Sequence, residues 1–247
     1  MKPIVGSASP ISRRKILGRL IGLGLAGMAP AREAAFAAER RGQASVEANH
    51  AAASSPERTL LVVGDSLSAG YGLETGRGWV DLLRDRLRKR KDHWQVINAS
   101  ISGDTTAGGL ARLPALLARD KPKAVIIELG GNDALRGLLL ADTRANLDRM
   151  VTLCKKAGAR VLMVGMEIPP NYGPTYTARF RAIFPEVAKA QKVALVPFLL
   201  AGVVTHPDWF QSDNIHPAAQ AQPVMLDTVW PHLAPLLSLG KSREAAR

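Results

Sequence analysis

The sequence of 247 residues is poor in cysteine, in aromatic residues and in long apolar runs. Its single cysteine, Cys154, excludes an internal disulfide and any zinc site built from several cysteines. With three Tyr and five Phe it lacks the aromatic surface on which single-stranded nucleic acids stack, so no nucleic-acid partner is expected. Outside the leader described below, no segment is long and apolar enough to span a bilayer. The histidines stand far apart, at positions 50, 93, 206, 216 and 232, so no local pair predicts a metal site.

What remains is an ordinary globular composition, 47% hydrophobic and 22% charged, with a formal net charge of +12. The length predicts one domain or at most two. A single domain of this size buries roughly 70% of its unfolded surface, so it needs no disulfide or metal to be stable. The positive charge permits attraction to anionic surfaces but carries no information about the fold.

Residues 1–37 have the order of an export signal: a basic segment, an apolar segment and a small-x-small cleavage site. Ser12-Arg13-Arg14-Lys15-Ile16-Leu17 resembles the twin-arginine export motif, and a glycine-rich apolar stretch follows at 20–31. That stretch is shorter than the roughly 20 residues of a membrane-spanning helix. We therefore expect cleavage after Ala37 and a periplasmic or secreted protein. The alternatives are a basic tail or an uncleaved anchor. Residues 38–58 show no hydrophobic period and are expected to form a flexible lead-in.

The remaining segment, 59–247, alternates short apolar runs with helical patterns. Runs at 59–63, 95–98, 124–129, 161–164 and 193–196 are typical of strands buried on both faces. Apolar residues at helical spacing lie between them, around residues 79–87, 110–117, 147–154 and 180–187. A last helix is expected to begin near Pro217 and to carry Met225, Val229 and Leu233. The alternation predicts one α/β domain, with a parallel sheet covered by helices on both faces.

Ligands bind such sheets at the carboxyl ends of the strands, and the segments there are rich in serine and glycine. After the first run, Ser66 stands on a tight strand-to-helix turn. Position 68 is Ser rather than Gly, so this turn is not the G-x-S-x-G elbow of α/β-hydrolases. The turn alone fits a nucleophile, a phosphate-binding loop or a plain connection.

Two further segments could supply hydrogen-bond donors to a negatively charged oxygen. Gly103 follows the second run and Asn132 the third. The backbone N–H groups of Ser66 and Gly103, with the Asn132 amide, would stabilise a tetrahedral acyl intermediate. Each glycine loop taken singly also fits a simple strand exit.

Near the carboxyl terminus, Asp213 and His216 are three residues apart on a turn before the expected last helix. This spacing lets the carboxylate accept the imidazole Nδ1–H, which leaves Nε2 free to take a proton from Ser66. Asp213 could equally cap the helix, and the two roles are compatible.

Four blocks in this order resemble the SGNH (GDSL) hydrolase family, most closely its bacterial periplasmic arylesterase, thioesterase and lysophospholipase group. The blocks are Gly64-Asp65-Ser66-Leu67, Ser102-Gly103-Asp104-Thr105, Gly130-Gly131-Asn132-Asp133 and Asp213-Asn214-Ile215-His216. The resemblance covers about residues 59–237. It implies a flavodoxin-like three-layer α/β/α sandwich with a five-stranded parallel sheet in the order 2-1-3-4-5. It also implies hydrolysis without metal or cofactor.

Carried over by position, the resemblance implies Ser66 as nucleophile, His216 as general base and acid, and Asp213 as orienting carboxylate. Ser66, Gly103 and Asn132 would form the oxyanion hole. It also implies an acyl pocket beside the segment 167–177. Substrate contacts are expected from Asp65, Leu67, Ile168, Pro169 and Tyr172.

The remaining candidates receive structural interpretations. Cys154 lies on an apolar helical stripe and is expected in the core. The basic run at 84–91 predicts a solvated helix end, and the alternative is peripheral contact with an anionic membrane. Asp65 and Asp104 are assigned no chemical step.

The function expected is that of an exported, monomeric serine hydrolase of aryl or short-chain acyl esters, thioesters and lysophospholipids. One alternative is a carbohydrate acetylesterase that uses the same residues. The other is a non-catalytic module that binds phosphate or flavin through its serine and glycine loop.

Overall fold

The computed structural model describes residues 58–90 and 93–239. The predicted export signal at 1–37 and all but the last residue of the predicted lead-in lie outside the described residues. That last residue, Arg58, is the first of a strand rather than the end of a linker. Within the described ranges no helix is both long and apolar enough to cross a membrane.

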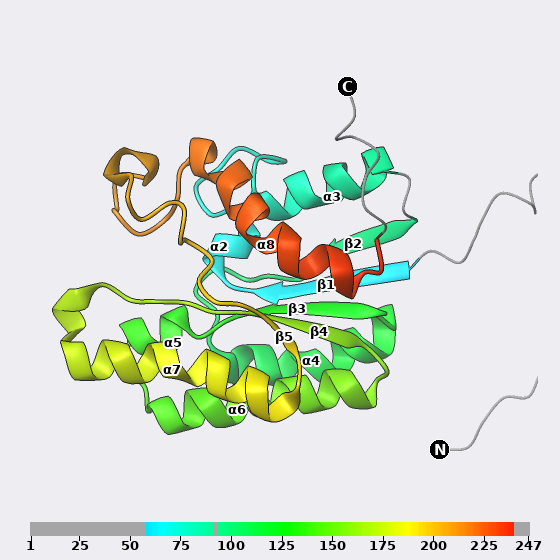
Figure 1. The fold of residues 1–247 in the computed structure, drawn as a ribbon, viewed down its shortest axis with the longest axis horizontal. Coiled ribbons are helices and arrows are strands. Elements are labelled where there is room, and N and C mark those ends of the chain that lie inside the picture. The colour runs from blue at the N-terminus through cyan, green and yellow to red at the C-terminus, as the bar shows by residue number, and fades with distance from the viewer. Residues whose placement is uncertain (1–57, 91–92, 240–247) are drawn as a thin grey trace, which may run out of the picture. The chain divides into compact units, whose positions relative to one another are not determined.

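The sheet has five parallel strands in the order β2-β1-β3-β4-β5 (Figure 1). The strands are β1 (Arg58–Gly64), β2 (Trp94–Asn98), β3 (Ala124–Glu128), β4 (Arg160–Val164) and β5 (Ala194–Val196). Every residue of β3 is buried, because helices cover both faces of this central strand. The order places the topological switch point between β1 and β3, which is where ligands bind in such sheets.

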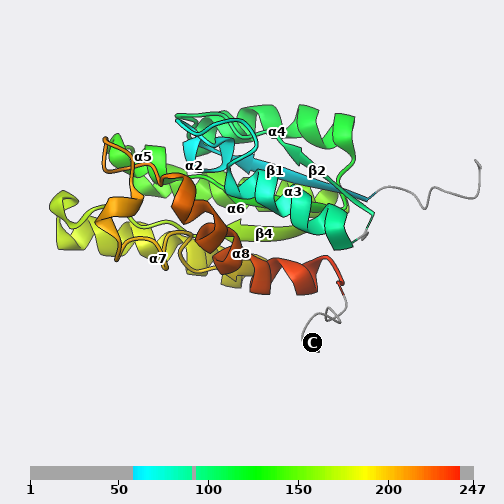
Figure 2. The same cartoon turned by 90° about the horizontal axis from the view of Figure 1, so that it is seen from above.

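Helices form a layer on each face, so the molecule is the three-layer α/β/α sandwich that the sequence predicts (Figures 1 and 2). Helices α3 (Trp79–Arg90) and α8 (Gln222–Leu236) pack together over one face. Helices α4 (Thr106–Asp120), α6 (Leu140–Lys156) and α7 (Pro174–Gln191) cover the other. Two short helices, α2 (Ser66–Ala69) and α5 (Gly131–Leu135), follow β1 and β3 directly. Single 3-10 turns occupy η1 (Pro170–Tyr172), η2 (Pro207–Trp209) and η3 (Ala219–Ala221).

The last helix begins at Gln222 and not near Pro217 as expected. The main chain at Pro217 is extended because Pro217 pairs with Phe210 in an antiparallel bridge. The Ala218 N–H then donates to the Trp209 carbonyl at 2.7 Å, which keeps this residue out of a helix. Proline does occupy the first turn of α8, but it is Pro223. The apolar positions assigned to this helix are correct, since Met225, Val229 and Leu233 are all buried.

Cys154 and the arginines of the basic run lie where the sequence predicts them. Cys154 is buried in α6, and burial raises the pKa of its thiol to about 12, so it is un-ionised and unreactive at neutral pH. In the basic run, Arg84 and Arg88 pair with aspartates one turn earlier on α3. Arg86 reaches Asp227 on α8 at 2.8 Å. Arg84 and Arg88 therefore pair within the surface of α3, and Arg86 joins α3 to α8. Lys91 lies outside the described residues.

Candidate active site

Ser66 is held at the carboxyl end of β1 by a very short helix. Asp65 caps α2, because its carboxylate accepts the Leu67 N–H at 3.0 Å. The helix ends after one turn at Gly70, whose φ of 75° lies in the left-handed region that glycine enters without strain. Ser66 thus stands on a sharp turn beside the switch point of the sheet, only half-buried.

His216 lies between Ser66 and Asp213, which are far apart in sequence. The Ser66 Oγ is 2.9 Å from His216 Nε2, and His216 Nδ1 is 2.6 Å from Asp213 Oδ2. Because Nδ1 faces a carboxylate, it carries the proton, and Nε2 is the nitrogen free to accept the Ser66 hydroxyl proton. The ring of Tyr71 packs against the imidazole, with centroids 4.6 Å apart.

The Asp213 carboxylate is fixed within its own turn. Its Oδ1 accepts the backbone N–H of His216 at 3.0 Å and that of Ile215 at 2.9 Å. The backbone hydrogen bond from His216, followed by that residue's side chain, lowers the pKa of Asp213 to about 2. Asp213 does not cap α8, which begins only at Gln222. The turn orients the imidazole and has no part in starting the helix.

The turn is attached to the rest of the fold by a buried amide. Gln222 is 2% exposed, and its Oε1 accepts the Trp79 N–H at the start of α3, at 3.0 Å. Its Nε2 donates to the Pro217 carbonyl at 3.2 Å, directly after His216. One side chain therefore fixes the position of the histidine turn relative to α3.

The expected oxyanion donors lie directly after β2 and β3, at the same end of the sheet as Ser66. Gly103 has a φ of 77°, which a side chain would disfavour. Asn132 is in the first turn of α5, and its amide Nδ2 donates to Asp65 Oδ2 at 3.2 Å. A primary amide has two N–H groups, so the second remains available to a bound oxygen.

Next to Ser66 lies a pair of buried carboxyl groups, Asp65 and Glu128, and only Asp65 is among the residues expected from the sequence. Glu128, at the end of β3, is 1% exposed and accepts the Ser68 hydroxyl at 2.7 Å and the Asp65 N–H at 3.4 Å. Desolvation, followed by the nearby Asp65 carboxylate, raises the pKa of Glu128 well above its usual value. Burial also raises the pKa of Asp65, to about 6. A glutamate inside an otherwise apolar strand was the only signal of this pair in the sequence.

Arg112 is a second residue that the sequence analysis missed. Its Nε donates to Asp104 at 2.8 Å, while Nη1 reaches the Ala99 carbonyl and Nη2 reaches the Gly64 carbonyl at 3.5 Å. One guanidinium therefore joins the ends of β1 and β2 to the loop that carries Gly103. Asp104, which flanks the site, acts here as an anchor for that loop.

The expected substrate-contacting residues are divided between the interior and the surface. Asp65 is 3% exposed, with both carboxylate oxygens hydrogen-bonded, and Leu67 packs against the core. Ile168, beside Pro169, lines a hollow of about 430 Å³. Tyr172 is 38% exposed, and its hydroxyl donates to the Leu135 carbonyl at 3.3 Å, which joins the 167–177 segment to α5.

Within the described ranges, no group of three or more His, Cys, Asp or Glu side chains is placed to hold a metal ion. The arrangement offers a hydroxyl, an imidazole with an orienting carboxylate, and N–H donors after β2 and β3. Those groups suffice for acyl transfer to and from a serine.

Comparison with known proteins gives concordant matches. The model of the GDSL-like Lipase/Acylhydrolase family matches residues 62–222. Esterase TesA of Pseudomonas aeruginosa is 55% identical over 180 residues, which cover 73% of this chain and 90% of that protein. The Arylesterase of Vibrio mimicus is 47% identical, with 72% and 89% covered. Thioesterase 1/protease 1/lysophospholipase L1 of Escherichia coli K12 is 44% identical, with 73% and 85% covered. A crystal structure of TesA superposes with a TM-score of 0.71 at 55% identity, covering 72% of this chain and 99% of that one.

Proposed function

The chain belongs to the GDSL-like lipase/acylhydrolase family, and from this premise we propose that it is an exported serine esterase acting through an acyl-enzyme on Ser66. The observation that carries the proposal is the continuous contact from Ser66 Oγ through His216 to Asp213, at 2.9 and 2.6 Å. The family relatives named as esterases and a thioesterase support the reaction class.

In the proposed reaction, Ser66 Oγ attacks the acyl carbonyl while His216 Nε2 takes the hydroxyl proton. The bond to the alcohol or thiol breaks, and that leaving group receives the proton from His216. Water then attacks the acyl-enzyme with His216 again as base, which releases the acid and restores Ser66. The Ser66 and Gly103 N–H groups and the Asn132 amide hold the oxyanion of each tetrahedral intermediate.

The substrates proposed are aryl and short-chain acyl esters, acyl thioesters and lysophospholipids, in line with the names of the relatives.

The twin-arginine-like leader supports a periplasmic or secreted location, and a monomer is proposed. Cell fractionation followed by N-terminal sequencing checks the location: periplasmic protein that begins at Ala38 is expected, whereas protein found only in the cytoplasmic fraction with residue 1 retained would contradict it. A non-catalytic phosphate or flavin module leaves Asn132 and the Asp213–His216 pair without a role.

The decisive experiment is Ser66→Ala, assayed with p-nitrophenyl acyl esters. We expect kcat/KM to fall by about a thousandfold or more, because nucleophile loss leaves only the oxyanion hole and binding. Ser102→Ala is the matched control, since Ser102 is exposed in the neighbouring loop. A Ser66→Ala enzyme that hydrolyses the ester at the parental rate, or a parent that a serine-directed fluorophosphonate fails to label, contradicts the proposal.

A further inference from the structure

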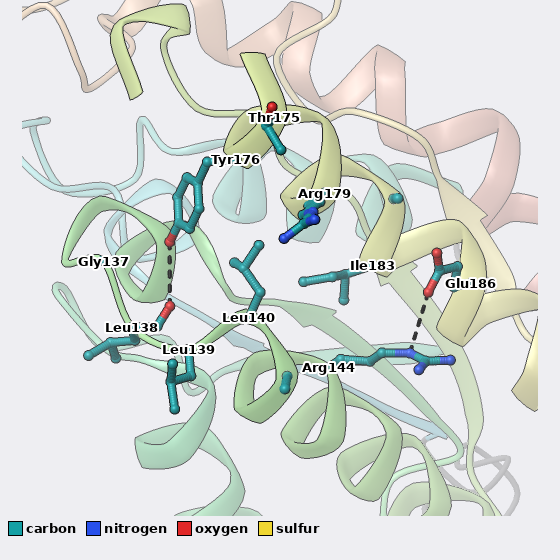
Figure 3. A pocket seen from close by; sticks show the side chains of 12 residues that line it. Gly137, Leu138, Leu139, Leu140, Arg144, Thr175, Tyr176, Arg179, Ile183 and Glu186 are labelled. Atoms are coloured by element: carbon teal, nitrogen blue, oxygen red, sulfur yellow. Dashed lines mark hydrogen bonds and ion pairs between the residues drawn. The ribbon is translucent and has the colours of Figure 1, made fainter. Parts of the chain in front are cut away.

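A groove of about 590 Å³ lies between the start of α6 and the middle of α7, and its lining differs from that of the Ser66 site (Figure 3). Leu140 and Ile183 form its floor, with Ala182 beside them. Leu139, which also lines the groove, is 71% exposed, so the apolar surface of the groove continues to the solvent. The volume falls within the range of about 300–1,000 Å³ that small-ligand sites occupy.

Three charged side chains stand around this apolar floor. Arg144 is paired with Glu186, with Nε 3.5 Å from the carboxylate. Arg179, on α7, points toward Leu140 and Ile183 and has no hydrogen bond or ion pair within the described part of the chain (Figure 3). The groove therefore carries one uncompensated positive charge next to a leucine-rich surface.

We propose that this groove binds a monoanionic amphiphile, specifically a long-chain carboxylate, with its carboxylate on Arg179 and its chain along Leu140 and Ile183. A guanidinium matches a carboxylate in two parallel hydrogen bonds. Because Glu186 already neutralises Arg144, a ligand with one negative charge neutralises the remaining charge of the groove. A doubly charged phosphate would leave the groove with a net negative charge. Identifying this ligand with the acid released by the enzyme rests on the proposed function, but the binding does not.

The groove also borders the segment that follows the Asn132 helix. Leu138 and Leu139 line it, and the Tyr176 hydroxyl, on its wall, is 3.3 Å from the Ala134 carbonyl and 3.4 Å from that of Leu138. A bound chain therefore contacts the loop between α5 and α6. The site is separate from the hollow at Ile168, whose lining shares no residue with it.

The test measures binding of dodecanoate below its micellar concentration by titration calorimetry, using the full chain carrying Ser66→Ala. Arg179→Gln in this background is expected to weaken one equivalent of dodecanoate binding by about tenfold, the effect of losing a hydrogen bond to a charged group. Arg149→Gln is the matched control, because Arg149 is an exposed arginine of α6 that does not line the groove. Ala182→Glu, which adds a carboxylate to the groove, is expected to abolish the same equivalent.

Dodecanol has the same chain as dodecanoate but carries no charge. Its binding is therefore expected to be the same in Arg179→Gln and Arg149→Gln. Equal dodecanoate isotherms for the Arg179 and Arg149 variants, with unchanged thermal unfolding, overturn the proposal. Inorganic phosphate that binds Arg179 as tightly as dodecanoate also overturns it. Dodecanoate contains no ester, so these outcomes are read independently of whether Ser66 is the nucleophile.

Discussion

At the scale of single residues, the site contains one pair that is fixed within its own turn and two groups that are positioned by contacts distant in sequence. Asp213 and His216 orient each other within one turn, through two backbone N–H groups and one side-chain contact. Ser66 and Asn132 depend instead on Asp65, which contacts both the α2 backbone and the Asn132 amide. The spacing of Asp213 and His216 in the sequence predicts their contact. The contacts of Asp65 with α2 and Asn132 could be seen only in the three-dimensional fold.

Asp213→Asn tests the orienting role. The amide can present its NH₂ group to Nδ1, which favours the tautomer with the proton on Nε2 and removes the base that Ser66 needs. We expect kcat/KM to fall by about a thousandfold with the fold intact. The measurement is ester hydrolysis at pH 8, with Asp208→Asn as an exposed control from the preceding loop. Comparable losses in both variants, or none in either, would contradict this role.

Because the pKa of Asp213 is about 2, its protonation does not contribute to any loss of activity between pH 8 and pH 4.

At the scale of elements, the sequence located each strand to within a residue or two, because strands buried on both faces form continuous apolar runs. It placed the start of α8 too early, because the bridge between Phe210 and Pro217 is a long-range contact with no periodic signal. Glu128 falls within the apolar run that predicts β3, but its contacts are with Ser68 and Asp65, which follow a different strand, β1. Local patterns thus predicted the elements, while the polar contacts between them required the three-dimensional structure.

Helix α7 ends with a strained residue that offers a test of its stability. Lys192 has a φ of 54° at the C-cap, a conformation that costs a residue with a side chain about 1 kcal/mol. Lys192→Gly is expected to raise the free energy of unfolding by about 0.5–1 kcal/mol, measured by urea denaturation. The matched Lys189→Gly change, inside the same helix, is expected to lower it by about 1 kcal/mol. A loss of stability in both variants would show that the Lys192 side chain contributes more than its backbone costs.

At the scale of the whole molecule, the two buried carboxyl groups determine how stability changes with pH. Both pKa values are raised in the folded state, so the folded protein retains protons that the unfolded chain has released. This contribution is complete below about pH 4, the ordinary value for a carboxyl group, and is lost as pH rises through the folded-state pKa values. Asp65 and Glu128 contact each other, so this loss belongs to the pair rather than to either residue.

Glu128→Gln keeps an oxygen for Ser68 and for the Asp65 N–H but cannot ionise. We expect its free energy of unfolding to match the parent near pH 4, to exceed it at pH 8, and to vary less steeply between these limits. Urea denaturation across this pH range is the measurement. Glu186→Gln, an exposed acid on α7, is the control and is expected to leave the slope of the parent unchanged. A Glu128→Gln curve parallel to the parent would show that Glu128 is not the proton-holding group.

The Gln222 amide has a consequence for how this fold can diversify. All of its hydrogen bonds are to main-chain atoms, at Trp79, Pro217 and Ala218. Peptide groups are the same whatever side chains they carry, so substitutions at Trp79, Pro217 or Ala218 can leave these main-chain hydrogen bonds in place. The exposed turn at 204–208 can therefore accept insertions, deletions and new side chains during evolution, while the imidazole keeps its position relative to the serine.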